Sequence, residues 1–395
     1  MKVLLINTYY DPYVFGGAER SVQVLAEALV NSGTPAVVAS IAPKGRFRKE
    51  WIRGVEVCYL PIRNLYAPLN RNVLCRLLAP LWHLVDTYNP WMDQAIDRLI
   101  QWSRPEVVHT NNLSGFSVAA WSAASRLGLP VVHTLRDYYL LCPRSTMFHR
   151  KRNCLSQCWY CRLYSRVRQG MTKAVAAVVG NSRFILERHL QSGCFGNAKV
   201  RDVIFNAFPG NVFPSSDSGP GHKPFRLGYL GRLKPNKGVE LLLQVMEMVR
   251  PEEYQLYLGG KDEMGLREKN RMGHVHFLGF VKPEEFFPKI DVLVVPSLWH
   301  DPLPRTIFEA YAFGIPVIGS CRGGIPEVID NGKTGLVFDP DSPETLVASV
   351  HKATSDIGNL KRMKMHALEK SRAFMPDVLA SRYLGIYRNV ANSRL

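Results

Sequence analysis

Two acidic residues and a pair of glycines near position 300 have the types and spacing of a ligand-binding site. Asp301 and Glu309 are separated by seven residues and follow Asp291–Pro296, an apolar run that predicts a buried strand. Gly323 and Gly324, further along, permit tight turns and a close approach of the backbone to a ligand. Carboxylates just beyond a buried strand are well placed to bind hydroxyl groups or cations.

The segment between these two acids predicts a helix that could bind an anion. Pro304 suits the first turn of a helix, where its missing N–H costs nothing, so we expect a helix over Pro304–Phe313. The backbone N–H groups of Arg305 and Thr306 would then lie at its positive end, where phosphate oxygens bind readily.

Two cations follow another strand-like run, Phe225–Leu230. Arg232 offers a planar fork of donors and Lys237 a point charge. Two cations in a loop are, by themselves, most often a solvated surface. If they were fixed beside a helix start, they would offset the negative charge of a phosphate ligand.

Together these elements resemble family 4 of the glycosyltransferases, whose fold is GT-B. The family signature is two acids separated by seven residues, an A-x-G-x-P-V strand, a G-G-x-x-E loop and an earlier G-R-x-x-x-x-K-G element. This chain has Asp301 and Glu309, then Ala312–Val317 and Gly323–Glu327, and earlier Gly231–Gly238.

The resemblance implies roles in sugar transfer for four residues. Glu309 would hold the ribose hydroxyls of a nucleotide-sugar donor, and Asp301 would contact hydroxyls of the transferred sugar. Arg232 and Lys237 would bind the donor diphosphate. The family more often has Glu at the first acid, so the shorter Asp301 alters the reach towards the sugar. Asp301 could instead only cap the helix that Pro304 begins.

The resemblance also implies a wider donor site. Gly16 and Gly17 follow the first strand and open a helix, as the family's glycine-rich loop does, although a helix-start turn without a ligand would look the same. They do not form a G-x-G-x-x-G dinucleotide fingerprint. The implied donor-binding residues are Gly16, Gly17, Phe280, Val281, Arg305, Thr306, Gly323 and Gly324.

The pair Arg136 and Asp137, after the strand-like run Val131–Leu135, departs from the family pattern. Many relatives have His-Asp at this place, facing the reaction centre. Arg136 replaces that His and could bind a phosphate of the acceptor or of the donor. Both residues are therefore candidates for the acceptor site or reaction centre.

Four cysteines with the spacing C-x11-C-x3-C-x2-C are a candidate metal site. Thiolates at such short spacing could hold a structural zinc tetrahedrally, and neighbouring basic residues would favour their ionisation. Buried free thiols or a redox-sensitive loop are the alternatives. Catalysis in the resembled family needs no cofactor, so any zinc would be structural. The four residues are Cys142, Cys154, Cys158 and Cys161.

Apolar runs alternate with helical patterns along the whole chain, which predicts an α/β protein with parallel sheets. The resemblance makes these two doubly wound, Rossmann-like domains facing a central cleft. We expect an acceptor-binding domain over 1–210 and a donor-binding domain over 222–375, with a final helix over 376–395 crossing back to the first. Ser215–Pro224, rich in Ser, Gly and Pro, is the expected linker.

The charge of +17 is concentrated in the first half, where residues 1–210 hold 26 Lys and Arg against 12 Asp and Glu. Such asymmetry suggests an anionic partner. The cysteine-rich stretch over 142–188 is the most basic part. No stretch reaches the roughly 18 apolar residues that a membrane span needs, and we expect a cytoplasmic protein, at the inner face of a membrane if the anionic partner is lipid.

The resemblance therefore implies a retaining hexosyltransferase that is independent of metal ions. It would use a UDP- or GDP-sugar and a lipid-linked or polysaccharide-precursor glycan, with no nucleic acid. The alternative is a GT-B scaffold without activity, whose basic, aromatic and cysteine-containing segment binds nucleic acid or protein.

Overall fold

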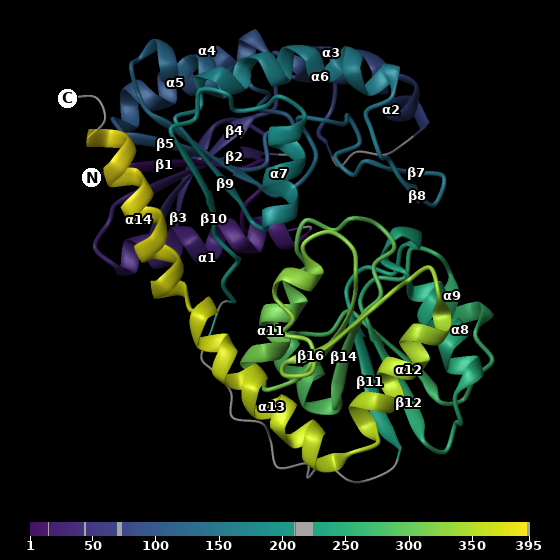
Figure 1. Ribbon diagram of the computed structural model, residues 1–395. Helices are drawn as coiled ribbons and strands as arrows, with labels where there is room; N and C mark the ends of the chain where they lie inside the picture. The colour runs from purple at the N-terminus through teal and green to yellow at the C-terminus, as the bar shows by residue number, and fades with distance from the viewer. Residues whose placement is uncertain (15, 43–44, 69–72, 209, 211–223, 393–395) are drawn as a thin grey trace. The chain divides into compact units, whose positions relative to one another are not determined.

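The computed structural model describes every residue except 15, 43–44, 69–72, 209, 211–223 and 393–395. The chain divides into two compact units (Figure 1). The first comprises Met1–Met147, Cys154–Ala207 and Pro376–Leu395, and the second comprises Phe148–Asn153 and Phe208–Met375. The expected linker, apart from Pro224, lies outside the described residues.

The first unit is built on an eight-stranded sheet. Its strands are β1 (Val3–Ile6), β2 (Ala36–Ala42), β3 (Arg48–Ile52), β4 (Val55–Pro61), β5 (Val107–Thr110), β6 (Val131–Leu135), β9 (Ala177–Gly180) and β10 (Val200–Val203). Their order is β10-β9-β6-β5-β1-β2-β4-β3, and all pairs are parallel except β3 with β4. The chain thus reverses its direction of travel across the sheet between β1 and β5.

Helices cover both faces of this sheet, as the apolar runs predict. They are α1 (Gly17–Asn31), α2 (Val73–Leu77), α3 (Ala79–Thr87), α4 (Pro90–Ser103), α5 (Ala119–Arg126), α6 (Trp159–Met171), η1 (Thr172–Ala174), α7 (Arg183–Gln191) and α14 (Pro376–Asn392). The final helix packs along α1 in the first unit.

Tyrosines of α14 anchor it to the core of the first sheet. The Tyr387 hydroxyl lies 2.6 Å from Nδ1 of His109, and the Tyr383 hydroxyl lies 2.9 Å from Oγ1 of Thr134. Burial lowers the pKa of His109 well below its ordinary value, so the imidazole is neutral and acts as a hydrogen-bonding core residue. Residues from the end of the chain thus complete the core that its beginning forms.

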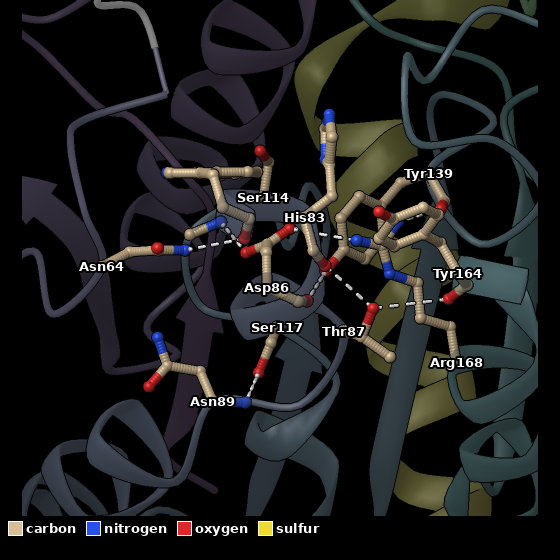
Figure 2. Close-up of polar contacts among 12 residues, drawn as sticks. Asn64, His83, Asp86, Thr87, Asn89, Ser114, Ser117, Tyr139, Tyr164 and Arg168 are labelled. Carbon is tan, nitrogen blue, oxygen red and sulfur yellow. Dashed lines mark hydrogen bonds and ion pairs between the residues drawn. The ribbon is translucent and has the colours of Figure 1, made fainter. Parts of the chain in front are cut away.

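A buried ion pair joins α3 to α6. Arg168 lies 3.3 Å from Oδ2 of Asp86, and both side chains are fully buried. Figure 2 shows Asp86 and Arg168 pointing towards one another beside Tyr139. Arg168 also donates to the Tyr139 carbonyl, and Gly115 N–H donates to Asp86 at 2.6 Å. Burial raises the pKa of Asp86 to about 7, although Arg168 acts in the opposite direction.

The second unit contains a six-stranded, fully parallel sheet. Its strands are β11 (Phe225–Leu230), β12 (Tyr254–Gly259), β13 (Val275–Gly279), β14 (Val292–Val295), β15 (Val317–Ser320) and β16 (Gly335–Phe338), with the order β13-β12-β11-β14-β15-β16. The chain changes direction between β11 and β14. In open α/β sheets ligands bind at the carboxyl ends of strands at such a point.

Short and long helices connect these strands. They are η2 (Pro235–Lys237), α8 (Val239–Met248), α9 (Leu266–Lys269), α10 (Pro283–Phe286), η3 (Phe287–Lys289), α11 (Thr306–Ala312), η4 (Ile325–Glu327), α12 (Pro343–Thr354), α13 (Ile357–Ser371) and η5 (Arg372–Phe374). A two-stranded hairpin of β7 (Phe148–His149) and β8 (Arg152–Asn153) also belongs to this unit. In the described part of the chain, no helix has the length and apolar character of a membrane span.

Candidate functional site

Most of the predicted donor residues follow the carboxyl ends of strands in the second sheet. Arg232 and Lys237 follow β11, whereas Asp301, Arg305 and Glu309 follow β14. These two strands are hydrogen-bonded neighbours. The chain reversal at β11 and β14 therefore brings two sequence motifs to the same edge of one sheet.

Lys237 and Asp301 form an ion pair across this edge, although 64 residues separate them. Nζ of Lys237 lies 2.5 Å from Oδ2 of Asp301, and the Trp299 indole N–H donates to the same oxygen at 3.2 Å. Lys237 also stands 5.3 Å from the centre of the Trp299 ring. Asp301 is buried and the lysine is one-quarter exposed, so the ammonium group remains accessible to a ligand.

Two glycines allow the loops around this pair to approach closely. Gly238 (φ 74°) lies against the backbone at the end of β14, where an added Cβ would come within 1.8 Å of the Pro296 carbonyl oxygen. Gly323 (φ 60°) would bring a Cβ within 2.0 Å of the Asp301 carbonyl oxygen. Gly324 N–H donates to that same oxygen at 2.9 Å. The two-glycine loop thus holds the backbone of Asp301 in place.

Glu309 lies on α11 and pairs with Arg305 at 2.8 Å, one turn earlier. Our expectation that Pro304 occupies the first turn is wrong, because α11 begins at Thr306 with Arg305 at its N-cap. The predicted helix begins too early, because a proline before an apolar helical pattern can also be the residue that precedes the N-cap. Thr306 is half-buried at the first position of the helix.

The other donor candidates lie on this edge as well. Arg232 is exposed directly after β11, and no carboxylate of the described chain forms an ion pair with it. Phe280 directly follows β13 with 91% of its surface exposed, and the half-buried Val281 lies beside Gly259. An exposed aromatic ring is a surface on which a planar base can stack.

Arg136 and Asp137 follow β6 at the carboxyl edge of the first sheet. The Arg136 guanidinium donates to the side-chain oxygens of Asn111 at 2.8 Å and Asn206 at 2.7 Å, which fixes its direction. Asp137 accepts a hydrogen bond from Tyr139 N–H. Burial raises the pKa of Asp137 to about 6, so this carboxyl titrates close to neutral pH.

The glycine-rich loop also lies at the carboxyl edge of the first sheet. Gly16 is the N-cap of α1 and Gly17 its first residue, and neither has a positive φ. A Cβ at Gly16 would come within 3.3 Å of the Glu19 carboxylate. The structure therefore shows a helix start at which the N-cap residue forms no side-chain hydrogen bond.

The zinc prediction at the four cysteines is not supported. All four are free thiols, with Cys142 buried and Cys158 exposed, and the described residues include no cluster of His, Cys, Asp and Glu that could hold a metal ion. Burial raises the pKa of Cys154 and of Cys161, whereas hydrogen bonds from Cys161 lower the pKa of Cys158. At Cys154 the basic neighbours Arg188 and Arg144 do not outweigh this burial, contrary to our expectation.

Sequence reasoning did not identify Trp299, His300 and Asn111. Trp299 binds Asp301, while Nδ1 of His300 accepts from Gly323 N–H at 3.3 Å, and Asn111 orients Arg136. Asn111 directly follows β5, and Trp299 and His300 lie in the loop after β14, so a position after a strand is the one signal that could have found them.

The two sheets and their strand-edge sites define the class of glycosyltransferases with the GT-B fold. The chain matches the family model described as "Glycosyl transferase 4-like domain" over residues 16–204 and the one described as "Glycosyl transferases group 1" over residues 224–356. This chain belongs to that glycosyltransferase family, as its signature residues predict.

Relatives and solved structures extend this similarity over nearly the whole chain. A Klebsiella pneumoniae protein described as an uncharacterised 42.6 kDa protein in the cps region is 32% identical over 333 residues, which cover 83% of this chain and 87% of that protein. Sucrose-phosphate synthase of Thermosynechococcus elongatus has the same fold, with a TM-score of 0.77, 19% identity and 99% of both chains covered. HepE of Anabaena, solved in complex with UDP and glucose, has a TM-score of 0.72 and 19% identity, covering 98% of this chain and 99% of that one.

Proposed function

We propose that this protein transfers a hexose from a UDP-sugar to a polysaccharide-precursor or lipid-linked glycan, with retention of anomeric configuration. The observation that carries the proposal is the Lys237–Asp301 pair beside Arg305–Glu309 at the chain reversal of the second sheet. Similarity to HepE, whose structure contains UDP and glucose, favours UDP over GDP as the donor nucleotide.

The donor diphosphate would be neutralised by cations of the chain. Arg232 and Lys237 reach it from the loop after β11, and Arg305 with the backbone of Thr306 reaches it from the start of α11. Asp301 and Glu309 already face cationic partners, so their chemistry suits hydroxyl binding better than holding a divalent ion. This arrangement supports transfer without a metal ion.

The acids would select the two sugars of the donor. Glu309 is held at its Oε1 by Arg305 and keeps Oε2 for the ribose hydroxyls. Asp301, with one oxygen bound by Lys237 and Trp299, would accept from a hydroxyl of the transferred hexose. Because aspartate is shorter than glutamate, the hexose would sit closer to the loop after β14.

Transfer would proceed on one face of the hexose. The acceptor hydroxyl oxygen forms a bond to the anomeric carbon as the bond from that carbon to the diphosphate oxygen breaks. The hydroxyl proton passes to the departing phosphate oxygen, whose negative charge Lys237 and Arg232 stabilise. Attack from the leaving-group side retains the configuration without an enzyme nucleophile.

Retention can be tested without knowledge of the acceptor. Slow hydrolysis of a UDP-α-sugar, followed by proton NMR before mutarotation, should first give the α-anomer. First formation of the β-anomer would contradict retention, and a covalent glycosyl-enzyme trapped with a fluorinated donor would contradict front-face attack.

Replacing Glu309 with glutamine should weaken UDP binding by about 10- to 100-fold, because one charge-assisted hydrogen bond to a hydroxyl contributes about 1.5–3 kcal/mol. The dissociation constant from isothermal titration calorimetry measures this. Glu263→Gln is the matched control, since Glu263 also pairs with a cation of the second unit, Lys234, at 3.1 Å. Equal affinities of both variants and wild type would assign Glu309 a purely structural role.

Two further observations support a proposal for the acceptor and for the place of the reaction. The Klebsiella relative is described as lying in the cps region, which favours a polysaccharide precursor as acceptor. The excess of cations in residues 1–210 favours an anionic surface near the acceptor-binding unit. We therefore place the reaction at the cytoplasmic face of a membrane.

A further inference from the structure

Two neighbouring helices of the first unit present apolar side chains to solvent. On α6, Trp159, Leu163 and Val167 follow one another at four-residue spacing, and all three are exposed, Trp159 to 77%. On the adjoining segment, Leu77 ends α2 and Leu81 and Leu84 lie on α3, again exposed and at helical spacing. We name these six residues the α3–α6 face.

The two helices lie side by side, which places their exposed apolar residues in the same part of the first unit. The Tyr164 hydroxyl donates to the Pro80 carbonyl at 3.2 Å near the start of α3, and Arg168 pairs with Asp86 near its end. Figure 1 shows α3 and α6 running next to each other over the first sheet. The buried contacts of Figure 2, among them the one between Arg168 and Asp86, join the two helices.

The exposed charged side chains described on these helices are positive. Arg162 and Arg166 are exposed on α6, beside Leu163 and Val167. Residues 73–87 and 159–171 contain a single acidic residue, Asp86, and it is fully buried. By contrast α4, the next helix along the chain, carries Asp93 and Asp97 in ion pairs with Arg126. The exposed charged side chains described on these two helices are thus cations.

We propose that the α3–α6 face docks on an anionic membrane surface, with Trp159, Leu163 and the α3 leucines entering the headgroup boundary. This inference rests on the proposed function, which needs a glycan acceptor at a membrane, and identifies the surface that meets the lipid. A tryptophan with leucines on the apolar side and arginines beside them is the composition of helices that lie in the membrane interface. Each cation near an anionic leaflet adds electrostatic attraction.

A nucleic acid fits this surface less well. Single-stranded nucleic acid uses aromatic rings and cations, whereas five of the six residues of the α3–α6 face are aliphatic. Aliphatic side chains gain free energy on leaving water for hydrocarbon, and several exposed apolar side chains in one region mark an interaction site.

Vesicle flotation of the full-length protein tests the proposal. Vesicles of phosphatidylcholine with about one-quarter phosphatidylglycerol should float with the wild-type protein bound. Binding should weaken as the salt concentration rises, because salt screens the attraction between the cations and the anionic lipid. The double variant Trp159→Ser/Leu163→Ser should lose at least about 10-fold in the vesicle partition coefficient. The double variant Arg162→Gln/Arg166→Gln should lose its preference for anionic over pure phosphatidylcholine vesicles.

A tryptophan elsewhere on the first unit provides the control. Trp51 on β3 is 74% exposed, close to the value for Trp159, so Trp51→Ser should float like the wild type. Brominated lipid should quench fluorescence of the wild type and of Trp51→Ser more strongly than that of Trp159→Phe.

UDP affinity, measured on the same samples, separates this inference from the proposed function. A wild type that binds UDP but does not float overturns membrane docking and leaves sugar transfer standing. A protein that floats without binding UDP contradicts sugar transfer only. Concentration-dependent self-association or RNA binding that is lost in Trp159→Ser/Leu163→Ser, without flotation, would assign the face to another partner and overturn the proposal.

Discussion

Exchanging Lys237 for methionine should lower turnover by about 100- to 1,000-fold while changing the affinity for UDP far less. Methionine keeps most of the length of the side chain and removes the charge. The Lys237 ammonium stands 2.5 Å from Asp301 at the switch point of the second sheet, where charge would develop on the leaving diphosphate. Removing one electrostatic stabiliser of a transition state costs about 2.7–4 kcal/mol. The initial rate of UDP release from the donor measures the effect.

Lys234 gives the matched control for this substitution. It lies three residues earlier in the same loop and pairs with Glu263 rather than with an acid after β14. Lys234→Met should keep most of the wild-type rate. If Lys237→Met retains more than about one-tenth of the rate, or if Lys234→Met loses as much, the leaving group is stabilised elsewhere.

Arg168→Met should destabilise the protein by about 3–5 kcal/mol, because it leaves a carboxylate buried without its cation. Arg168 and Asp86 are both fully buried, and Arg168 also binds the Tyr139 carbonyl. Urea denaturation of the full chain, followed through the transition of the first unit, measures the loss. Arg166→Met, an exposed position of the same helix, should change the stability by less than about 0.5 kcal/mol.

The loss of stability in Arg168→Met should be larger at high pH than at low pH. Burial raises the pKa of Asp86 from 3.8 to about 7 in the folded protein, and Arg168 is the strongest influence in the opposite direction. A folded pKa above the unfolded one means that the folded state holds the extra proton, so stability falls as pH rises from about 4 through 7. Arg168→Met should therefore be more destabilised at pH 8 than at pH 5, and adding Asp86→Asn should restore part of the stability at pH 8.

A loss below about 1 kcal/mol, or one independent of pH, would show that Asp86 keeps solvent or another partner when Arg168 is removed. The contact between α3 and α6 would then not depend on this ion pair.

The central strands could be predicted from the sequence because their residues are apolar on both faces. The strands Val131–Leu135 and Phe225–Leu230 match the expected ranges. The edge strand Arg48–Ile52 was missed because its alternately exposed, charged residues read as a loop, and it pairs antiparallel with β4.

The candidate site was only partly predictable. Motif spacing placed Lys237 and Asp301 in separate loops, but their direct contact depends on β11 and β14 being neighbours, which no local pattern states. The contacts of Arg136 with Asn111 and Asn206 could not be predicted for the same reason. At the cysteines, the sequence shows the spacing of the thiols but not their burial, and burial raises the pKa of Cys161.

The most direct test of the account is calorimetric titration of the wild-type chain with UDP-, GDP- and ADP-sugars, checked by thermal shift. Saturable binding of a UDP-sugar at one site per chain, weakened in Glu309→Gln and unchanged in Glu263→Gln, is the predicted result. A folded protein that binds none of these nucleotides would contradict sugar transfer and favour a GT-B scaffold that acts by binding another macromolecule.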